Sequence, residues 1–179
     1  MAIETIKTEI KIETKIGLRG KLHQNRMNKI ILAISTLCLL FLGCKHNNLV
    51  DTNLSLPENN WAYAKSVKAE VEVKDISAKY QVYFKFRHTN AYRYANLFVL
   101  FNLKGNGLNK KLRYQFQLAK ADGTWTGKGS GDIFTQNFIL LKNFQFPKAG
   151  KYTIEIEQNM RDNPLIGVSD VGVSVSKTP

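Results

Sequence analysis

The stretch YQVYFKFRHT, residues 80–89, decides the fold of this chain. Its apolar and polar side chains alternate, and successive side chains of a β-strand point to opposite faces of the sheet. One face carries Tyr80, Val82, Phe84 and Phe86. The other face carries Gln81, Tyr83, Lys85 and Arg87. The alternation predicts a half-buried strand.

Similar patterns lie on both sides of this stretch. Residues 67–73 and 112–119 alternate in the same way, whereas residues 96–103 are apolar on both faces and suit a central strand. We expect the last two to form a hairpin, and we expect three further strands in FILLKNFQF, KYTIEIEQ and VGVSVS. No segment from residue 61 onward has the apolar spacing of an amphipathic helix. The sequence therefore predicts an all-β antiparallel β-sandwich of about seven or eight strands over residues 61–179.

An apolar run precedes this domain. Ile30 to Leu42 are thirteen uncharged, mostly apolar residues, fewer than the about 20 that a membrane-spanning helix needs. Lys29 before the run and Gly43-Cys44 after it are typical of a signal peptide. The segment LFLGC resembles a lipobox, in which the cysteine receives a diacylglyceryl group and becomes the first mature residue, although Phe41 departs from the usual leucine. A secretory signal without lipid and a short anchor helix are the alternatives.

The predicted organisation follows from this leader. Residues 1–26 are interpreted as upstream sequence, because a start at Met27 gives the signal peptide an n-region of ordinary length. Residues 27–43 then form the lipoprotein signal peptide. Residues 44–60, polar and rich in asparagine, form the lipidated cysteine and a flexible tether. No run of acids follows Cys44, which favours a lipoprotein of the cell envelope on the periplasmic face of the outer membrane.

The charge and the residue inventory exclude several kinds of site. The formal net charge is +12, and residues 45–179 carry nineteen Lys/Arg against eleven Asp/Glu. Such a balance suits nucleic acid, an anionic membrane surface or an acidic glycan, but a secreted, lipid-tethered protein rarely meets nucleic acid. No cysteine follows Cys44, and His88 is the only histidine of the predicted domain, which excludes disulfides, cysteine-ligated zinc and a histidine cluster there. We predict no enzyme, metal, cofactor, small-molecule substrate or nucleic-acid partner, and we expect His88 at the surface or satisfied by a neighbour.

Two local clusters of side chains are candidate sites. Tyr92, Arg93 and Tyr94 form a basic and aromatic cluster that can grip nucleic acids or sugars, and here a sugar or a protein partner fits better. Asp122 and Asp132 could form a carboxylate pair, but each lies beside a turn glycine and has a structural interpretation. The first cluster is therefore the candidate partner-binding surface.

Three blocks of the chain, in order, carry a family resemblance: YRYANLFVLF, ADGTWTGKGSGDI and FQFPKAGKYTIEIEQNMRDNPLIGVSDVGVSV. Over residues 61–175 they resemble the gliding-motility lipoprotein GldH family of the Bacteroidota. The resemblance implies a non-enzymatic envelope component that is required for gliding and binds other envelope proteins of the gliding and type IX secretion machinery. The positions that match the family's motifs are Asn96, Asp122, Gly123, Trp125, Gly127, Gly129, Gly131, Asp132, Gln158, Met160, Arg161, Gly167, Asp170 and Gly172.

Most of these positions have structural interpretations. Glycines permit positive φ, Trp125 packs, and Asp132 or Asp170 accepts turn hydrogen bonds. Arg161 is the candidate for a partner contact, because a planar guanidinium can bind a carboxylate through two parallel bonds. An internal ion pair with Asp162 or Asp170 is an equal alternative.

The alternative function is that of a carbohydrate-binding envelope lipoprotein. Such a protein stacks exposed tyrosine and tryptophan rings on sugar rings. A shallow groove with coplanar exposed aromatics would favour this function, and burial of Trp61 and Trp125 would count against it.

Overall fold

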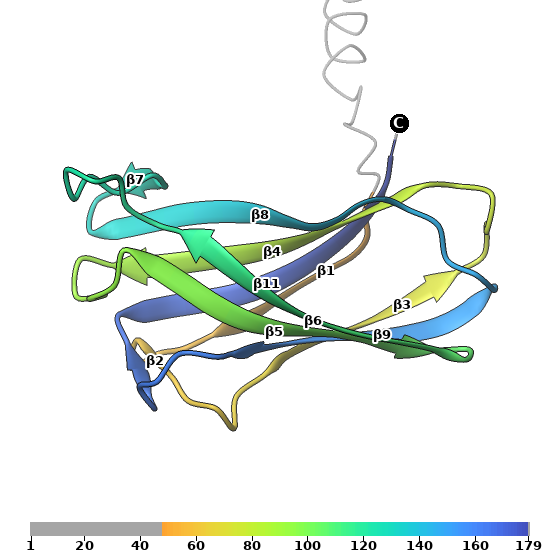
Figure 1. The fold of residues 1–179 in the computed structure, drawn as a ribbon, viewed down its shortest axis with the longest axis horizontal. Coiled ribbons are helices and arrows are strands. Elements are labelled where there is room, and N and C mark those ends of the chain that lie inside the picture. Colours follow the sequence, from red (N-terminus) through yellow and green to blue (C-terminus); the bar gives the residue numbers. More distant parts are fainter. Residues whose placement is uncertain (1–47, 179) are drawn as a thin grey trace, which may run out of the picture. The chain divides into compact units, whose positions relative to one another are not determined.

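The computed structural model describes residues 48–178 (Figure 1). The predicted upstream sequence, the signal peptide and Cys44 lie outside these residues. The strands are β1 (Asn48–Ser55), β2 (Asn60–Trp61), β3 (Val67–Val73), β4 (Tyr80–Thr89), β5 (Asn96–Gly105), β6 (Leu108–Gln117), β7 (Lys128–Ser130), β8 (Ile133–Phe144), β9 (Gly150–Gln158), β10 (Leu165–Ile166) and β11 (Val168–Lys177). Eight of these strands have seven or more residues, and β2, β7 and β10 have two or three.

The strands form two packed sheets, which Figure 1 shows as two layers. One sheet has the order β1-β11-β4-β8-β7, the other has the order β3-β9-β5-β6, and β10 and β2 form a separate pair. All of these pairings are antiparallel. The described residues contain no helix. The predicted all-β antiparallel sandwich is confirmed.

Strand β4 behaves as its alternation predicts. It lies between β11 and β8, and its apolar face is fully buried at Tyr80, Val82, Phe84 and Phe86. The Phe84 ring lies 6.1 Å from Trp61 and 5.9 Å from Phe116. The stretch that decides the fold therefore occupies the centre of the core, where each large side chain contributes about 1.5–3 kcal/mol through burial.

The N-terminal boundary of the domain was predicted wrongly. Residues 48–55, assigned to the tether, form β1, which pairs with β11 from Asn48↔Ser176 to Ser55↔Asp170. The strand contributes only Leu49, Val50 and Leu54 to the core edge, and its other residues are polar. Its stability comes from the backbone ladder with β11, which no apolar pattern reveals.

The two sheets meet along β6 and β8 through aromatic packing. The rings of Phe116 and Phe138 stack with centroids 4.1 Å apart, and the Tyr114 hydroxyl donates a hydrogen bond to the Leu140 carbonyl. The predicted β5–β6 hairpin is present, with full register from Asn96↔Gln117 to Gly105↔Leu108. Its turn is shorter than residues 104–111, which separate the two predicted strands, because Asn106 and Gly107 alone make it, both at positive φ.

Candidate partner-binding groove

A groove of about 440 Å³ lies where the β4–β5 loop, β5, β6 and the segment after β9 meet. We call it the arginine groove. It is lined by Tyr94, Phe98, Arg113, Asn159, Met160, Arg161 and Asp162. Two of the predicted partner-binding residues, Tyr94 and Arg161, are therefore brought together although 66 positions of sequence separate them.

The segment 159–164 that forms one wall of the groove is organised by a buried amide. The side chain of Gln158 is 3% exposed. Its Nε2 donates to the Asp162 carbonyl at 2.9 Å and to the Trp61 carbonyl at 3.4 Å. Its Oε1 accepts a hydrogen bond from the Met160 backbone nitrogen at 2.8 Å. One side chain thus ties the start and the middle of the wall to β2.

Further hydrogen bonds hold the same wall. The Tyr63 hydroxyl donates to the Met160 carbonyl at 2.6 Å, and the Tyr63 backbone nitrogen donates to Asn163 Oδ1 at 2.9 Å. The Phe98 backbone nitrogen donates to Met160 Sδ at 3.2 Å. The wall is consequently anchored to residues about 60 and 100 positions away in sequence, so the groove does not depend on its own short segment for its shape.

The acidic side chain of the groove is already bonded. The Tyr94 hydroxyl donates a hydrogen bond to the Asp162 carboxylate. This bond is the main cause that raises the pKa of Tyr94. Asp162 therefore holds the β4–β5 loop against the segment after β9.

The two arginines of the groove differ in their surroundings. The Arg113 guanidinium lies 4.1 Å from the Phe98 ring centroid, a cation–π geometry, and its Nε donates to Asn159 Oδ1 at 2.7 Å. Arg161 is exposed. Among residues 48–178, Arg161 has no carboxylate within 4.0 Å. Phe98 and Asn159 thus hold the side chain of Arg113 in place, whereas the guanidinium of Arg161, which has five N–H donors, makes no ion pair in the described part of the chain.

The internal ion pair considered for Arg161 is not formed. Asp170 pairs with Arg87 at 3.0 Å, and Asp162 is bonded to Tyr94. Arg87 and Asp170 lie on the neighbouring strands β4 and β11 of the five-stranded sheet, so this ion pair links the two strands. The partner contact of Arg161 stays a prediction.

The predicted Tyr92-Arg93-Tyr94 surface is not one surface. Tyr92 is 2% exposed, its hydroxyl donates to the Asn96 carbonyl at 2.9 Å, and burial raises its pKa. The prediction that Tyr92 contacts a partner is wrong, because its ring is buried against those of Phe86 and His88. Arg93 is exposed but does not line the groove.

His88 lies in the core and not at the surface. It is fully buried, and the centroid of its ring lies 4.6 Å from that of Trp125 and 5.4 Å from that of Phe134. Its Nδ1 lies 3.1 Å from the Thr89 carbonyl, while Nε2 has no hydrogen-bond partner among the described residues. Burial lowers the pKa of His88. The signal was present in the sequence, since His88 continues the inward positions 80, 82, 84 and 86 of β4.

The block ADGTWTGKGSGDI forms the region around β7. Asp122 Oδ1 accepts a hydrogen bond from the Thr124 backbone nitrogen at 2.9 Å, and this backbone bond is the main cause that lowers the pKa of Asp122. Gly123 and Gly131 have φ of 83° and 59°, which fits turn positions. Asp132 is exposed in the turn between β7 and β8. Asp122 and Asp132 thus both lie in turns.

Four further glycines of the family motifs lie at close backbone approaches or on strands. A Cβ on Gly167 would lie 2.4 Å from the Tyr92 nitrogen, and one on Gly172 would lie 2.7 Å from the Thr52 carbonyl oxygen. Gly127 and Gly129 face Gln136 and Phe134 of β8. Trp125 is half-buried, and its Nε1 donates to Asn90 Oδ1 at 3.3 Å.

A second hollow, of about 400 Å³, lies on the outer face of the five-stranded sheet. It is lined by Asn53, Ser55, Lys85, Arg87, Thr135, Asn137 and Asp170, none of which is aromatic. Its cations are paired, Lys85 with Asp51 and Arg87 with Asp170. This surface offers hydrogen bonds but neither a stacking platform nor an unpaired charge.

Residues 48–178 hold no group of three or more His, Cys, Asp or Glu side chains that could bind a metal ion. No helix in the described part of the chain is long and apolar enough to cross a membrane.

The fold is that of a small all-β domain, and one end of it carries the arginine groove. A family model described as GldH lipoprotein matches residues 48–175, and the chain belongs to this family of gliding-motility lipoproteins of the cell envelope.

The chain aligns with most of the length of two relatives. The chain is 31% identical over 150 residues to a protein of Christiangramia forsetii named gliding motility lipoprotein GldH homolog, across 78% of this chain and 90% of that protein. It is 26% identical over 147 residues to the gliding motility lipoprotein GldH of Flavobacterium johnsoniae, across 78% and 91%. A carbohydrate-binding module specific for non-crystalline cellulose is similar in structure with a TM-score of 0.42 and 8% identity, across 76% of this chain and 78% of that one. The last similarity is too low to carry an argument about function.

Proposed function

We propose that this lipoprotein is anchored to the membrane by lipid on Cys44 and acts as a non-catalytic assembly component of the gliding apparatus, linked to type IX secretion, by binding another envelope protein in the arginine groove. The observation that carries the proposal is Arg161, an exposed arginine without an internal ion pair on a wall that Gln158 and Tyr63 hold in place.

The lining of the groove fits a protein partner. Arginine, tyrosine, phenylalanine and methionine are the residues enriched in the energetic centres of protein interfaces. Arg113 stacks on Phe98, so its charge reinforces that of Arg161 at the same surface. A partner segment with a carboxylate beside an apolar side chain would satisfy both the cations and the apolar floor.

The surroundings of His88 support a non-catalytic function. A serine nucleophile needs a base at hydrogen-bond distance that is oriented by an acid. The Nδ1 of His88 contacts a backbone carbonyl, and aromatic rings surround its side chain. The only histidine of the described residues is thus occupied in packing.

Carbohydrate binding has weaker support. Trp61 is fully buried and its Nε1 donates to the Lys65 carbonyl at 2.6 Å, so it offers no face to a sugar. Trp125 is half-buried against His88. The polar hollow on the other sheet has no aromatic side chain in its lining.

The expected location is the periplasmic face of the outer membrane. Lys45 and His46 follow Cys44, where an acidic run would favour display outside the cell. Mass spectrometry of the mature N-terminus tests this anchor. A first mature residue other than lipidated Cys44 would overturn the anchor.

The test of the groove is complementation of a deletion strain. We expect deletion to abolish colony spreading and to reduce the release of secreted proteins. Arg161→Ala should lower capture of the partner in affinity purification about tenfold or more, and Arg161→Lys should restore it only in part, because lysine cannot make a bidentate contact. Arg93→Ala is the matched control, an exposed arginine outside the groove, and should behave as wild type. Normal colony spreading of the deletion strain would contradict the proposal.

A further inference from the structure

One end of the sandwich is rich in lysine. Strand β1 begins there, where Asn48 pairs with Ser176. The β3–β4 and β8–β9 loops lie at the same end, because Tyr80 pairs with both Lys177 and Phe144. The β5–β6 turn joins them, since Asn106 Nδ2 donates to the Lys151 carbonyl at 3.1 Å. This lysine end carries Lys74, Lys79, Lys104, Lys110, Lys111, Lys142, Lys148, Lys151 and Lys177.

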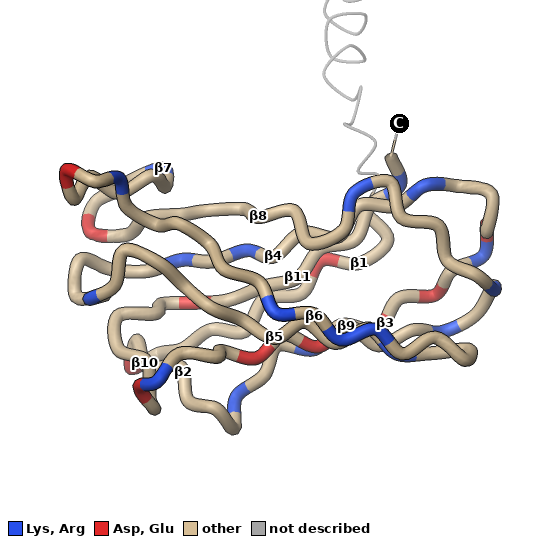
Figure 2. The backbone as a smooth tube through the Cα atoms, in the orientation of Figure 1, with Lys and Arg blue, Asp and Glu red and all other residues tan. Residues whose placement is uncertain are grey.

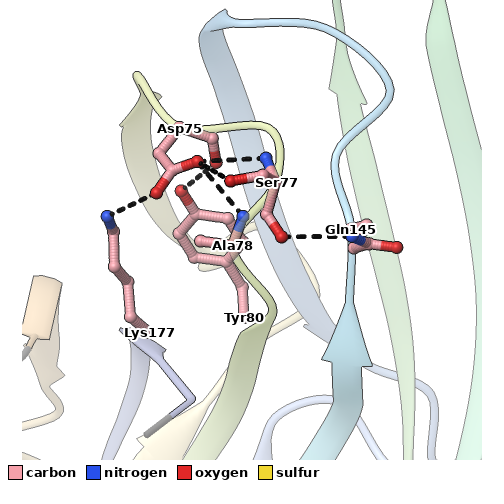
Figure 3. Close-up of polar contacts among 6 residues, drawn as sticks. All are labelled: Asp75, Ser77, Ala78, Tyr80, Gln145 and Lys177. Atoms are coloured by element: carbon pink, nitrogen blue, oxygen red, sulfur yellow. Dashed lines mark hydrogen bonds and ion pairs between the residues drawn. The ribbon is translucent and has the colours of Figure 1, made fainter.

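The positive charge of the lysine end is only partly neutralised. At the strand levels of these nine lysines the carboxylates are Glu70, Glu72, Asp75 and Glu155. Asp75 is held by hydrogen bonds from Ser77 and Ala78 and by an ion pair with Lys177 at 3.2 Å (Figure 3). Eight of the nine lysines are exposed and Lys110 is half-buried. Figure 2 shows these cations gathered around the loops on the side of the C-terminus.

The opposite end has almost no net charge. It holds six cations and five carboxylates: Lys65, Arg93, Arg113, Lys120, Lys128, Arg161, Glu58, Asp122, Asp132, Glu157 and Asp162. The arginine groove lies at this end, because Tyr94 precedes β5 and Arg161 follows β9. The charge of the domain is therefore polarised along its strands.

The sequence places the lipid attachment close to the lysine end. Three residues lie between Cys44 and Asn48, so the chain can separate the two Cα atoms by at most about 14 Å. Electrostatic attraction extends about 8 Å from a surface at physiological ionic strength. A lipid on Cys44 would therefore hold the start of β1 within about two such lengths of the attachment point.

We propose that the lysine end docks on anionic lipid headgroups, so that the sandwich stands on the membrane with the arginine groove directed away from it. This inference rests on the proposed anchor at Cys44. The ten residues of β5 span about 33 Å, and this length sets the height of the groove above the headgroups.

The test uses the full chain, processed and lipidated in a bacterial host and reconstituted into vesicles. No cysteine follows Cys44, so a fluorophore can be placed at one introduced cysteine, either Ile76→Cys at the lysine end or Thr124→Cys at the far end. Both positions are exposed. A headgroup-attached quencher reports contact with the surface in vesicles of phosphatidylcholine alone or of phosphatidylcholine mixed with phosphatidylglycerol.

We expect quenching at position 76 to rise about twofold or more when the anionic lipid is present, to fall back in high salt, and to stay low at position 124. The triple variant Lys74→Glu, Lys79→Glu and Lys148→Glu should lose the rise. The matched control Lys65→Glu, Lys120→Glu and Lys128→Glu makes the same charge change at the far end and should keep it.

Two failures are distinguishable. Vesicle-bound protein that is quenched equally with and without anionic lipid, or that loses the rise in both triple variants, overturns the docking and leaves the anchor intact. Protein that carries no added lipid mass on Cys44 and stays out of the vesicles overturns both the anchor and the docking.

Discussion

Replacing Gln158 by leucine tests whether a buried amide organises the arginine groove. The substitution removes three hydrogen bonds of 2.8 Å, 2.9 Å and 3.4 Å. It leaves the Met160 nitrogen and the Asp162 and Trp61 carbonyls without their partner, at about 1–3 kcal/mol for each group that water cannot reach. Because Asp162 is exposed, water can replace part of the loss. We expect the free energy of unfolding to fall by about 2–4 kcal/mol.

Guanidinium chloride denaturation measures this change. The midpoint should fall while the slope stays unchanged, because the surface exposed on unfolding is nearly the same. Gln115→Leu is the matched control: Gln115 is exposed on β6, and the substitution should cost less than about 0.5 kcal/mol. Equal losses in the two variants would refute the organising role of Gln158. Gln158→Leu should also weaken capture of the partner, because the wall that presents Arg161 loses its attachment.

Three further predictions concern titration and backbone strain. Burial lowers the pKa of His88. The stability that neutral His88 contributes is therefore complete above its unfolded pKa of about 6.5 and is lost as the pH falls below that value. In His88→Phe, the free energy of unfolding should change less with pH below about 6.5. Hydrogen bonds, first from Ser77, lower the pKa of Asp75 to about 2; NMR titration should give this value, and the stability that Asp75 contributes should be present above about pH 4 and lost as pH falls towards 2. Gly167→Ala should cost about 3 kcal/mol or more, because φ is 85° and the new Cβ would lie 2.4 Å from the backbone. Gly123→Ala has φ of 83° but open space, and should cost about 1–2 kcal/mol in the same chemical denaturation.

The sequence predicted the strands whose faces differ in polarity. In β3, β4 and β9 the buried and exposed residues alternate as expected. Strand β1 was not predicted, because it is held by its backbone ladder with β11 and its side chains are mostly polar. Pairing between strands about 120 positions apart leaves no trace in local alternation.

The arginine groove was predicted only in part. Arg161 and Tyr94 were singled out as separate candidates, but Phe98 and Arg113 were not. These two face outward on neighbouring strands and meet because Phe98 pairs with Gln115 and Leu100 pairs with Arg113. Alternation gives the face of each residue, whereas the register decides which residues on that face are neighbours. The turn of two residues at Asn106 and Gly107, shorter than predicted, sets this register.

The charges of the domain separate two tasks between its ends. A basic surface that served the partner and the membrane equally would let anionic lipid compete for the groove. Here the lysines lie beside the start of β1, four residues after the proposed anchor at Cys44, and the far end is nearly neutral apart from the groove itself. In Arg113 the charge is fixed over an aromatic ring, which suits a partner of defined shape, whereas exposed lysines on loops suit a fluid surface of headgroups. The residue types at the two ends therefore match the two kinds of surface proposed for them. Arg161→Lys should weaken capture of the partner, whereas Lys79→Arg should leave the docking on anionic lipid unchanged.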